Sequence, residues 1–370
     1  MGVKSRAGST PVPGTILKAA IYNVMTVVTT SLHPDLELRF QSLDAVIGKT
    51  SCLVLHCTVK GEERKVFAKL ESSNLTGSIK DRMALHILRK AYESKSIQPG
   101  DTIVEATSGN TGIAFAGIGR ALGHPVRILM PDWMSKERTD VIKSLGATVI
   151  PVSKEEGGFL GSIALTEKYA EENDNIFLPC QFANNANVEA HALATAPELH
   201  CQMAGYHNTN LTAFVGGVGT GGTVMGFYKY FKKHLPSATI HPLEPSNSPT
   251  LSTGHKVGAH RIQGISDEFI PEIVDLESLD EIIAVDDGDA ICMAQRLASE
   301  LGLPVGISSG ANLLGALQVA FSQGKDSAVA TVFADCNKKY LSTDYVKEEA
   351  MKNDFLSKDV KLNYFEVITG

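Results

Sequence analysis

The sequence predicts an α/β fold in which mostly parallel, twisted sheets carry helices on both faces. From about residue 66 onward, short β-rich runs alternate with amphipathic helical stretches, which is the pattern of βαβ units. The chain has 370 residues, which at about 150 residues per domain corresponds to roughly two domains. No repeat, low-complexity tract or Pro/Gly-rich linker divides it, so we expect the two domains to share one continuous cleft.

The individual elements are predicted from local pattern. Short runs rich in β-branched residues predict strands at 66–70, 102–106, 126–130, 148–152, 176–178, 212–215, 240–244, 282–285 and 328–333. Apolar residues at helical spacing predict helices at 83–92, 113–122, 136–145, 162–172, 188–203, 224–235 and 289–301. Ligands of open α/β sheets bind beyond the carboxyl ends of the strands, so the loops there are where we expect a site.

The charge balance argues against nucleic acid as the main partner. Lys and Arg number 34 and Asp and Glu 41, a net charge of −7, whereas binding to a phosphate backbone favours a basic protein. The longest apolar stretches, such as 113–118 and 211–218, are far shorter than the roughly 18 to 20 residues that a membrane span needs. We therefore predict neither a nucleic-acid partner nor a membrane partner.

The six cysteines form neither a CxxC pair nor a metal-ligand spacing. This distribution predicts reduced thiols, no metal site and a cytoplasmic location. Residues 1–40 are interpreted as an N-terminal extension. Its first 34 residues hold three basic residues, no acidic residue and eight Ser or Thr residues, so organellar targeting stays open as an alternative.

The first candidate site is the small polar loop at residues 71–79, which leads from a predicted strand to Lys80 at the start of a helix. A lysine there lies at the positive end of the helix dipole, which favours the neutral amine that Schiff-base chemistry needs. The alternative is a solvent-exposed lysine in an ordinary first helical turn.

The second candidate is the turn Thr-Ser-Gly-Asn-Thr-Gly at residues 107–112, between the strand at 102–106 and the helix at 113–122. Free backbone N–H groups at a helix start, together with hydroxyls and an amide, are suited to binding a carboxylate. The alternative is a structural helix cap, with Ser108 or Asn110 as the capping residue.

The third candidate is the glycine-rich loop at residues 216–223, which precedes the helix at 224–235. Backbone without side chains at a helix N-terminus can wrap a phosphate, and Thr220 and Thr223 add hydroxyl donors. The same loop permits another interpretation. Gly217, Gly219 and Gly222 match G-x-G-x-x-G, and Glu244 lies about 20 residues further on, as an NAD-binding oxidoreductase would require.

The three loops together favour a phosphate-bearing aldehyde cofactor over a dinucleotide. A dehydrogenase leaves the lysine loop and the turn at 107–112 without a role. An aldehyde cofactor uses all three, with the lysine for the aldehyde, the glycine-rich loop for the phosphate and the turn for the carboxylate of an amino-acid substrate.

Six motifs then connect the chain with a known family. They are Ser-Ile-Lys-Asp-Arg at 78–82, the turn at 107–112, Gln-Phe at 181–182, Gly-Thr-Gly-Gly-Thr at 219–223, Gly-Ile-Ser-Ser-Gly-Ala at 306–311 and Tyr-Leu-Ser-Thr at 340–343. With these motifs, residues 47–343 resemble the cysteine synthase and cystathionine β-synthase group of pyridoxal-phosphate enzymes, fold type II. The resemblance implies two open, mostly parallel twisted sheets as in tryptophan synthase β, and a homodimer.

The implied domains are a smaller α/β domain at 81–190 and a larger cofactor-binding domain formed by 41–80 and 191–345, followed by a C-terminal tail at 346–370. The resemblance also implies roles for single residues. Lys80 is the internal aldimine and general base, and Asn110 lies beside the phenolic oxygen of pyridoxal 5′-phosphate. The phosphate is held by Gly219, Thr220, Gly221, Gly222 and Thr223. The substrate carboxylate is bound by Thr107, Ser108, Thr111 and Gln181.

The sequence departs from the family where a serine usually faces the pyridine nitrogen. Cys336 stands there, preceded by Asp335. A thiol is a weak, neutral partner that leaves the ring nitrogen largely unprotonated and favours β-elimination. If Asp335 faced the nitrogen, the ring would be protonated. A third interpretation makes Cys336 a small buried hydrophobic residue.

The implied activity is β-replacement on an activated L-serine, O-acetylserine or O-phosphoserine, with sulfide or a thiol as the nucleophile, through an aminoacrylate. This is the reaction of a cysteine synthase-like transferase. A cysteine β-lyase that produces hydrogen sulfide and a cystathionine β-synthase-like enzyme keep the same residues and stay open as alternatives. A cofactor-binding relative without activity is a further one.

Overall fold

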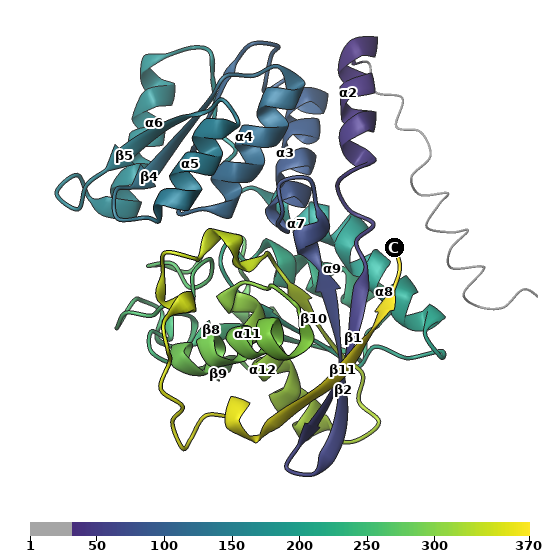
Figure 1. Cartoon of the computed structure of the whole chain (residues 1–370). Coiled ribbons are helices and arrows are strands. Elements are labelled where there is room, and N and C mark those ends of the chain that lie inside the picture. Colours follow the sequence, from purple (N-terminus) through teal and green to yellow (C-terminus); the bar gives the residue numbers. More distant parts are fainter. Residues whose placement is uncertain (1–31) are drawn as a thin grey trace, which may run out of the picture.

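The computed structural model describes residues 32–370 as two α/β bodies, one above the other in Figure 1. Each body is built on its own sheet, with seven strands in the larger body and four in the smaller. Most of the predicted N-terminal extension, and the segment on which organellar targeting depends, lie outside the described residues.

The sheet of the larger body has the strand order β11-β1-β2-β10-β7-β8-β9. Its strands are β1 (Cys52–Val59), β2 (Glu62–Leu70), β7 (Ala213–Gly217), β8 (Thr239–Pro245), β9 (Ile283–Val285), β10 (Val329–Phe333) and β11 (Val360–Ile368). The pairs from β2 through β9 are parallel, whereas β1 pairs antiparallel with both β2 and β11. The predicted mostly parallel sheet is confirmed, with an antiparallel edge.

The sheet of the smaller body is entirely parallel, in the order β5-β4-β3-β6. Its strands are β3 (Thr102–Ala106), β4 (Val126–Pro131), β5 (Thr148–Val152) and β6 (Ile176–Phe177). Successive residues of β3 belong to different cores, Ile103 to the cluster around α3 and α4 and Val104 to the cluster under α6. Because strand side chains alternate between faces, helices cover both faces of this sheet.

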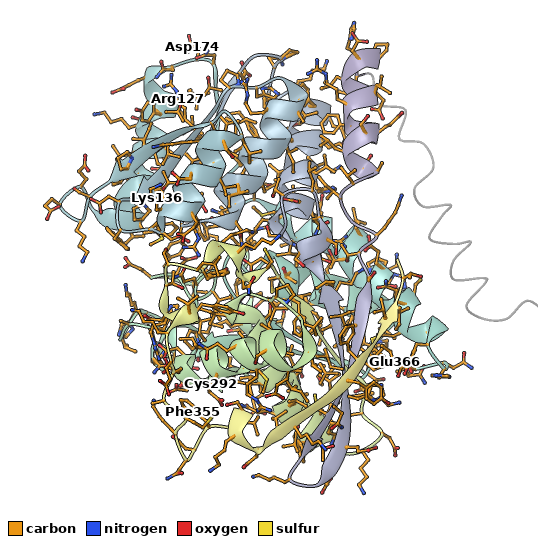
Figure 2. The ribbon with its side chains drawn as sticks, viewed as in Figure 1. Arg127, Lys136, Asp174, Cys292, Phe355 and Glu366 are labelled. Atoms are coloured by element: carbon orange, nitrogen blue, oxygen red, sulfur yellow. The ribbon has the colours of Figure 1, made fainter. Side chains whose placement is uncertain are left out.

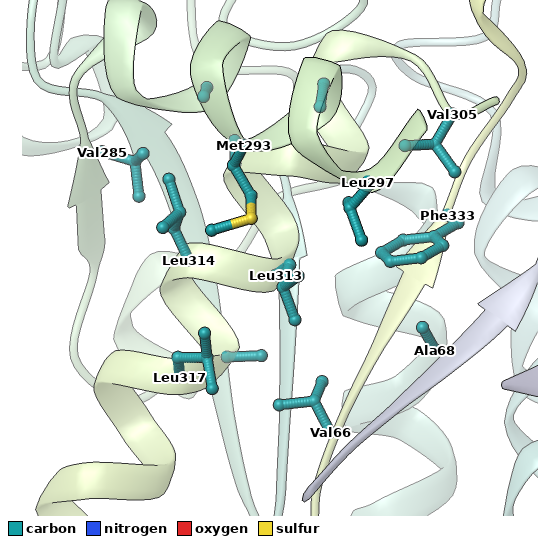
Figure 3. Close-up of a cluster of buried hydrophobic side chains, with 14 of the residues drawn as sticks. Val66, Ala68, Val285, Met293, Leu297, Val305, Leu313, Leu314, Leu317 and Phe333 are labelled. Carbon is teal, nitrogen blue, oxygen red and sulfur yellow. The ribbon is translucent and has the colours of Figure 1, made fainter. Parts of the chain in front are cut away.

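The same alternation organises the larger sheet. Val66 and Ala68 of β2 face the cluster that α11 (Asp287–Leu301) and α12 (Ile307–Gln323) complete, as Figure 3 shows. Phe67, between them in the sequence, packs instead in the cluster of α8 (Ala196–Gly205) and α9 (Gly222–His234). The larger sheet is therefore also covered on both faces.

The remaining helices complete the two bodies. They are α2 (Pro34–Asp44), α3 (Lys80–Ser94), α4 (Asn110–Leu122), α5 (Lys136–Ser144), α6 (Gly158–Glu172), α7 (Asn185–Ala190) and α10 (Thr250–Thr253), with a π-helical turn η2 (His191–Thr195) and the short 3-10 helices η1 (Glu71–Ser73), η3 (Leu276–Ser278), η4 (Asn337–Lys339), η5 (Asp344–Val346) and η6 (Ser357–Asp359). The helix predicted at 188–203 lies within a continuous helical run, α7, η2 and α8, in which the π-helical turn η2 separates the two α-helices.

The sequence patterns did not predict β1 and β11. The turn between β1 and β2 is only Lys60-Gly61, and both residues have positive φ, at 50° and 83°, as a two-residue hairpin turn with the twist of its strands requires. The segment 346–370, expected as a tail, reaches β11 by crossing α11. Asp289 of α11 accepts hydrogen bonds there from the backbone of Leu356 and Ser357. Phe355 also lies against α11, since its Cζ is 2.9 Å from the position of a Cβ at Gly288, and Figure 2 labels Phe355 and Cys292 of α11 in the larger body.

Candidate active site

One cavity of about 610 Å³ lies where the loops of the two bodies meet. The lysine loop follows β2, the turn at 107–112 follows β3 and the glycine-rich loop follows β7, so all three candidate sites lie at carboxyl ends of strands, as expected. Ten of the residues predicted for the site line this cavity. They are Lys80, Thr107, Ser108, Asn110, Thr111, Gln181, Gly219, Thr220, Gly221 and Thr223. Gly222 and Cys336 are not among the lining residues.

Lys80 is the first residue of α3, and its side chain faces the cavity. The backbone N–H of the preceding Ile79 donates to the carbonyl oxygen of Ala334 (2.9 Å), which ties the lysine loop to the end of β10. Burial lowers the pKa of Lys80, against the opposing charges of Asp267 and Asp335. The site therefore favours the neutral, nucleophilic amine.

The turn at 107–112 and Gln181 form one hydrogen-bonded group. The hydroxyl of Thr111 donates to Gln181 Oε1 (2.6 Å), and Gln181 Nε2 donates to the carbonyl oxygen of Ala106 (3.0 Å). The backbone N–H of Gly109 donates to the Thr107 hydroxyl (3.1 Å). The N-terminus of α4 and these polar groups thus face the cavity together, in an arrangement suited to an anionic carboxylate.

Glu105, which was not identified from the sequence, accepts a hydrogen bond from the backbone of Gln181. Glu105 of β3 is 5% exposed, and its Oε2 accepts from the backbone N–H of Gln181 (3.3 Å). Burial raises the pKa of Glu105 to about 8. Cys180, just before Gln181, has a φ of 52°, a left-handed conformation that is costly for a non-glycine residue and persists where surrounding contacts impose it.

The glycines of the glycine-rich loop leave a space that side chains at the same positions would fill. A Cβ at Gly219 would lie 2.5 Å from the carbonyl oxygen of Gly264, and one at Gly221, where φ is 84°, would lie 2.1 Å from Val274 Cγ2. Helix α9 starts at Gly222, so its first N–H groups point at the loop. The backbone donors, the helix dipole and the hydroxyls of Thr220 and Thr223 fit a phosphate group.

Two side chains that the sequence did not reveal support this loop. Asn187 of α7 donates from Nδ2 to the Thr220 hydroxyl oxygen and to the carbonyl oxygen of Gln181, both at 2.9 Å. His191 of η2 lies 3.4 Å from the Thr223 hydroxyl and 2.9 Å from that of Thr195. Burial lowers the pKa of His191 well below its ordinary value, which favours the neutral imidazole. Asn187 thereby links the glycine-rich loop to the backbone of Gln181.

Asp335 and Cys336 are distinguished by their surroundings. Asp335 is completely buried, and its Oδ2 accepts from Asn110 Nδ2 (2.8 Å) and from the Tyr340 hydroxyl (2.5 Å). Its Oδ1 lies so near Gly306 that a Cβ there would be 2.0 Å away. Cys336 is partly exposed, and its backbone pairs with Val305. The carboxylate is therefore turned towards Asn110.

Asp267 is a second acidic group in the cavity that the sequence analysis missed. It lies in the long irregular segment between α10 and η3 and lines the cavity. Burial raises the pKa of Asp267 to about 6, while the charge of Lys80 acts in the opposite direction. No short motif surrounds this aspartate, so only its position in the fold reveals it.

The structure removes the main support for a dinucleotide site. Glu244 is 1% exposed, and its Oε2 accepts from the backbone N–H groups of Leu251 (2.7 Å) and Ser252 (3.3 Å) at the start of α10. Its Oε1 accepts from the Ser252 hydroxyl. The carboxylate that would have to bind a ribose is engaged by the protein itself.

Comparisons with known proteins identify the family to which the chain is similar. A family model described as "Pyridoxal-phosphate dependent enzyme" matches residues 43–335. A cysteine synthase of Staphylococcus aureus is 41% identical over 302 residues, which cover 82% of this chain and 96% of the relative. The crystal structure of a hydrogen sulfide-producing enzyme from Fusobacterium nucleatum is 56% identical, with a TM-score of 0.88 and coverage of 90% of this chain and 100% of that one. An O-acetylserine sulfhydrylase isoform from Entamoeba histolytica is 34% identical, with a TM-score of 0.76 and coverage of 90% and 97%.

Proposed function

The chain belongs to the pyridoxal-phosphate dependent enzymes, and from this premise we propose that it is a cysteine synthase-like transferase for β-replacement on O-acetylserine or O-phosphoserine, with sulfide or a thiol as nucleophile. One observation carries the proposal. A lysine amine, a glycine-rich loop at a helix start and a Thr/Gln group all face the same cavity. These are the three parts that an aldehyde cofactor with a phosphate tail and an amino-acid substrate require.

The residues of the cavity fit pyridoxal phosphate. Lys80 would hold its aldehyde, Asn110 its phenolic oxygen and residues 219–223 its phosphate, because these groups match in charge and hydrogen-bonding capacity. When bound, the cofactor acts as an electron sink that makes the α-proton of an amino acid acidic and allows the β-substituent to leave.

Lys80 is proposed to move the α-proton. Its neutral amine would accept the proton from the α-carbon of the bound substrate and later return it. Burial supports this role because it lowers the pKa of Lys80, so that a larger fraction of the amine is unprotonated near neutral pH. Thr107, Ser108, Thr111 and Gln181 are proposed to fix the substrate carboxylate, which orients the α-carbon towards that amine.

Cys336 remains our proposal for the pyridine nitrogen. Asp335 Oδ2 is engaged by Asn110 and Tyr340, which supports a role for this oxygen away from the nitrogen, whereas Oδ1 lies near Gly306 and has no hydrogen-bond partner among the described residues. A thiol does not protonate the ring, which limits the electron sink and favours loss of the β-substituent over other reactions of the α-carbon.

Release of sulfide from cysteine is the second candidate function. Asp267 favours it, because a partly protonated carboxyl near Lys80 is a second group able to give or take a proton at the substrate. The similarity to the hydrogen sulfide-producing enzyme points the same way. The two functions share the loss of the β-substituent and differ in the donor that loses it and in whether a nucleophile is then added.

A titration of the purified protein with O-acetylserine, O-phosphoserine, serine and cysteine tests both functions. The visible absorbance of the cofactor is recorded for each donor, and products are quantified with and without sulfide. A transferase makes cysteine from an activated serine and sulfide, whereas a lyase converts cysteine and water to sulfide, pyruvate and ammonia, without a second substrate as nucleophile. A protein that takes up no pyridoxal phosphate, or whose spectrum no donor changes, contradicts the proposal.

Assembly and location remain proposals that rest on the family. We expect a homodimer, which light scattering coupled to size-exclusion chromatography would check, and a cytoplasmic location, which cell fractionation would check. Within residues 32–370, no helix is both long enough and apolar enough to cross a membrane.

A further inference from the structure

Lys339 is a buried cation that the chemistry described above does not use. It lies in η4 and is 6% exposed. Its Nζ is 2.6 Å from Asn110 Oδ1, 3.2 Å from the carbonyl oxygen of Gly77 and 3.9 Å from Asp335 Oδ2. One ammonium group thus joins the lysine loop, the start of α4 and the end of β10 beside the cavity.

The Asn110 amide is held between two charges of opposite sign. Its Oδ1 accepts from the ammonium of Lys339, and its Nδ2 donates to the carboxylate of Asp335 (2.8 Å). An ammonium can only donate hydrogen bonds and an ionised carboxylate can only accept them. Rotating the amide by half a turn would place its amino group against the ammonium and its carbonyl against the carboxylate. Both charge-assisted bonds would be lost, so the orientation of the amide is determined.

This orientation leaves one donor for a ligand. An amide nitrogen carries two hydrogens, and the hydrogen bond to Asp335 is the one that Nδ2 makes within the described residues. Since Asn110 lines the cavity, its second N–H is available to an acceptor bound there. An amide turned the other way would present an oxygen, which repels an anionic acceptor.

We propose that Lys339 is a positioning residue, which holds the Asn110 amide with its amino group towards the phenolic oxygen of the cofactor. This inference rests on the proposed function, because it takes pyridoxal phosphate as the occupant of the cavity. The donated hydrogen bond favours the anionic form of the phenolic oxygen. Loss of Lys339 therefore weakens cofactor binding and raises the pH at which the visible absorbance of the bound cofactor changes.

The test compares Lys339→Met with Lys338→Met, a matched control on the exposed neighbouring lysine. Cofactor-free protein is titrated with pyridoxal phosphate, and the visible absorbance of the loaded protein is followed against pH. We expect the cofactor Kd of Lys339→Met to rise about tenfold, the usual effect of losing a hydrogen bond to a charged group, and the pH midpoint to rise with it. Lys338→Met should match the wild type, and Lys339→Arg, which keeps a charged donor, should restore most of the affinity.

A double variant decides whether Lys339 acts through Asn110. The Kd of Asn110→Ala combined with Lys339→Met should equal that of Asn110→Ala alone, because residues that act through one another are non-additive. Additive losses, or a Lys339→Met protein with the wild-type Kd and pH midpoint, overturn the inference. If Lys339→Met fails to fold, Lys339→Gln, which keeps a neutral donor, should show a smaller loss of affinity, and wild-type behaviour there also overturns it. A wild-type protein that binds no pyridoxal phosphate refutes the proposed function instead.

Discussion

The turn at 107–112 and the glycine-rich loop at 216–223 occupy equivalent places in the two bodies. Each follows a parallel strand and starts a helix, so each offers free backbone N–H groups. They differ in side chains. The turn has four polar side chains, Thr107, Ser108, Asn110 and Thr111, beside two glycines, whereas the loop has five glycines, at each of which a Cβ would lie within 3.0 Å of another atom, beside Thr220 and Thr223.

This difference teaches how one supersecondary unit serves two kinds of ligand. A phosphate needs backbone at close range on several sides, which only glycine permits. A carboxylate and a ring oxygen are planar, directional acceptors, and oriented hydroxyls and amides distinguish them. The hydroxyls of the turn are therefore expected to determine substrate affinity, whereas the loop, together with Asn110, is expected to determine cofactor affinity.

The largest expected effect is that of Gly221→Ala in the loop. The new Cβ would lie 2.1 Å from Val274 Cγ2 at a φ of 84°, so both the backbone and its neighbour must shift. We expect the cofactor Kd to rise by about a hundredfold or more, measured by titration of cofactor-free protein. Gly254→Ala is the matched control, because Gly254 has a φ of 80° but nothing within 4 Å of its Cβ position. Equal losses in both variants would mean that backbone strain, not the filling of the space in the glycine-rich loop, is responsible.

A paired substitution separates the two regions. Thr111→Val removes the donor to Gln181 Oε1, and we expect the KM for the amino-acid donor to rise about tenfold while the cofactor Kd stays constant. Thr223→Val should have the opposite pattern. The cofactor Kd should rise by a similar factor, with little change in the KM for the amino-acid donor. If the cofactor Kd of Thr111→Val rose instead, the assignment of the Thr111 hydroxyl to substrate binding would be wrong.

Asn187→Ala should affect both regions, since Asn187 Nδ2 bonds to the Thr220 hydroxyl and to the carbonyl oxygen of Gln181. Loss of one neutral donor predicts moderate increases, about threefold to tenfold, in both the cofactor Kd and KM. The neighbouring Asn185, at the start of α7, provides a control as Asn185→Ala. A change confined to one constant would show that the link through Asn187 is not used.

The smallest effect concerns pH. Burial lowers the pKa of Lys80, and the negative charge of Asp267 partly offsets this effect by raising it. Asp267→Asn removes that negative charge, so the pKa of Lys80 falls and its amine becomes neutral at a lower pH. The rate at which cofactor-free protein combines with pyridoxal phosphate should then reach half its maximum at lower pH than in the wild type. A shift to higher pH, or none, would contradict the electrostatic contact between these two groups.

Much of the site was predictable because its signals are local. A strand, a turn and a helix start follow one another within a few residues at 102–113 and 212–224, and the glycines and hydroxyls lie in that same stretch. The β1–β2 hairpin gave a weaker signal, because its turn is Lys-Gly and not the common Asn-Gly or Asp-Gly. The strand β11 alternates polar and apolar residues, yet its partner β1 is about 300 positions away.

The sequence by itself determined which loops form the candidate site, because strand pattern, helix starts and glycine spacing are properties of neighbouring residues. The tertiary structure alone decided which distant side chains orient those loops. Lys339 reaches Asn110 across 229 positions and Asn187 reaches Thr220 across 33, while Asp267 meets Lys80 from an irregular segment. Such contacts follow from the order of strands in the sheets and the packing between the two bodies, which no local pattern contains.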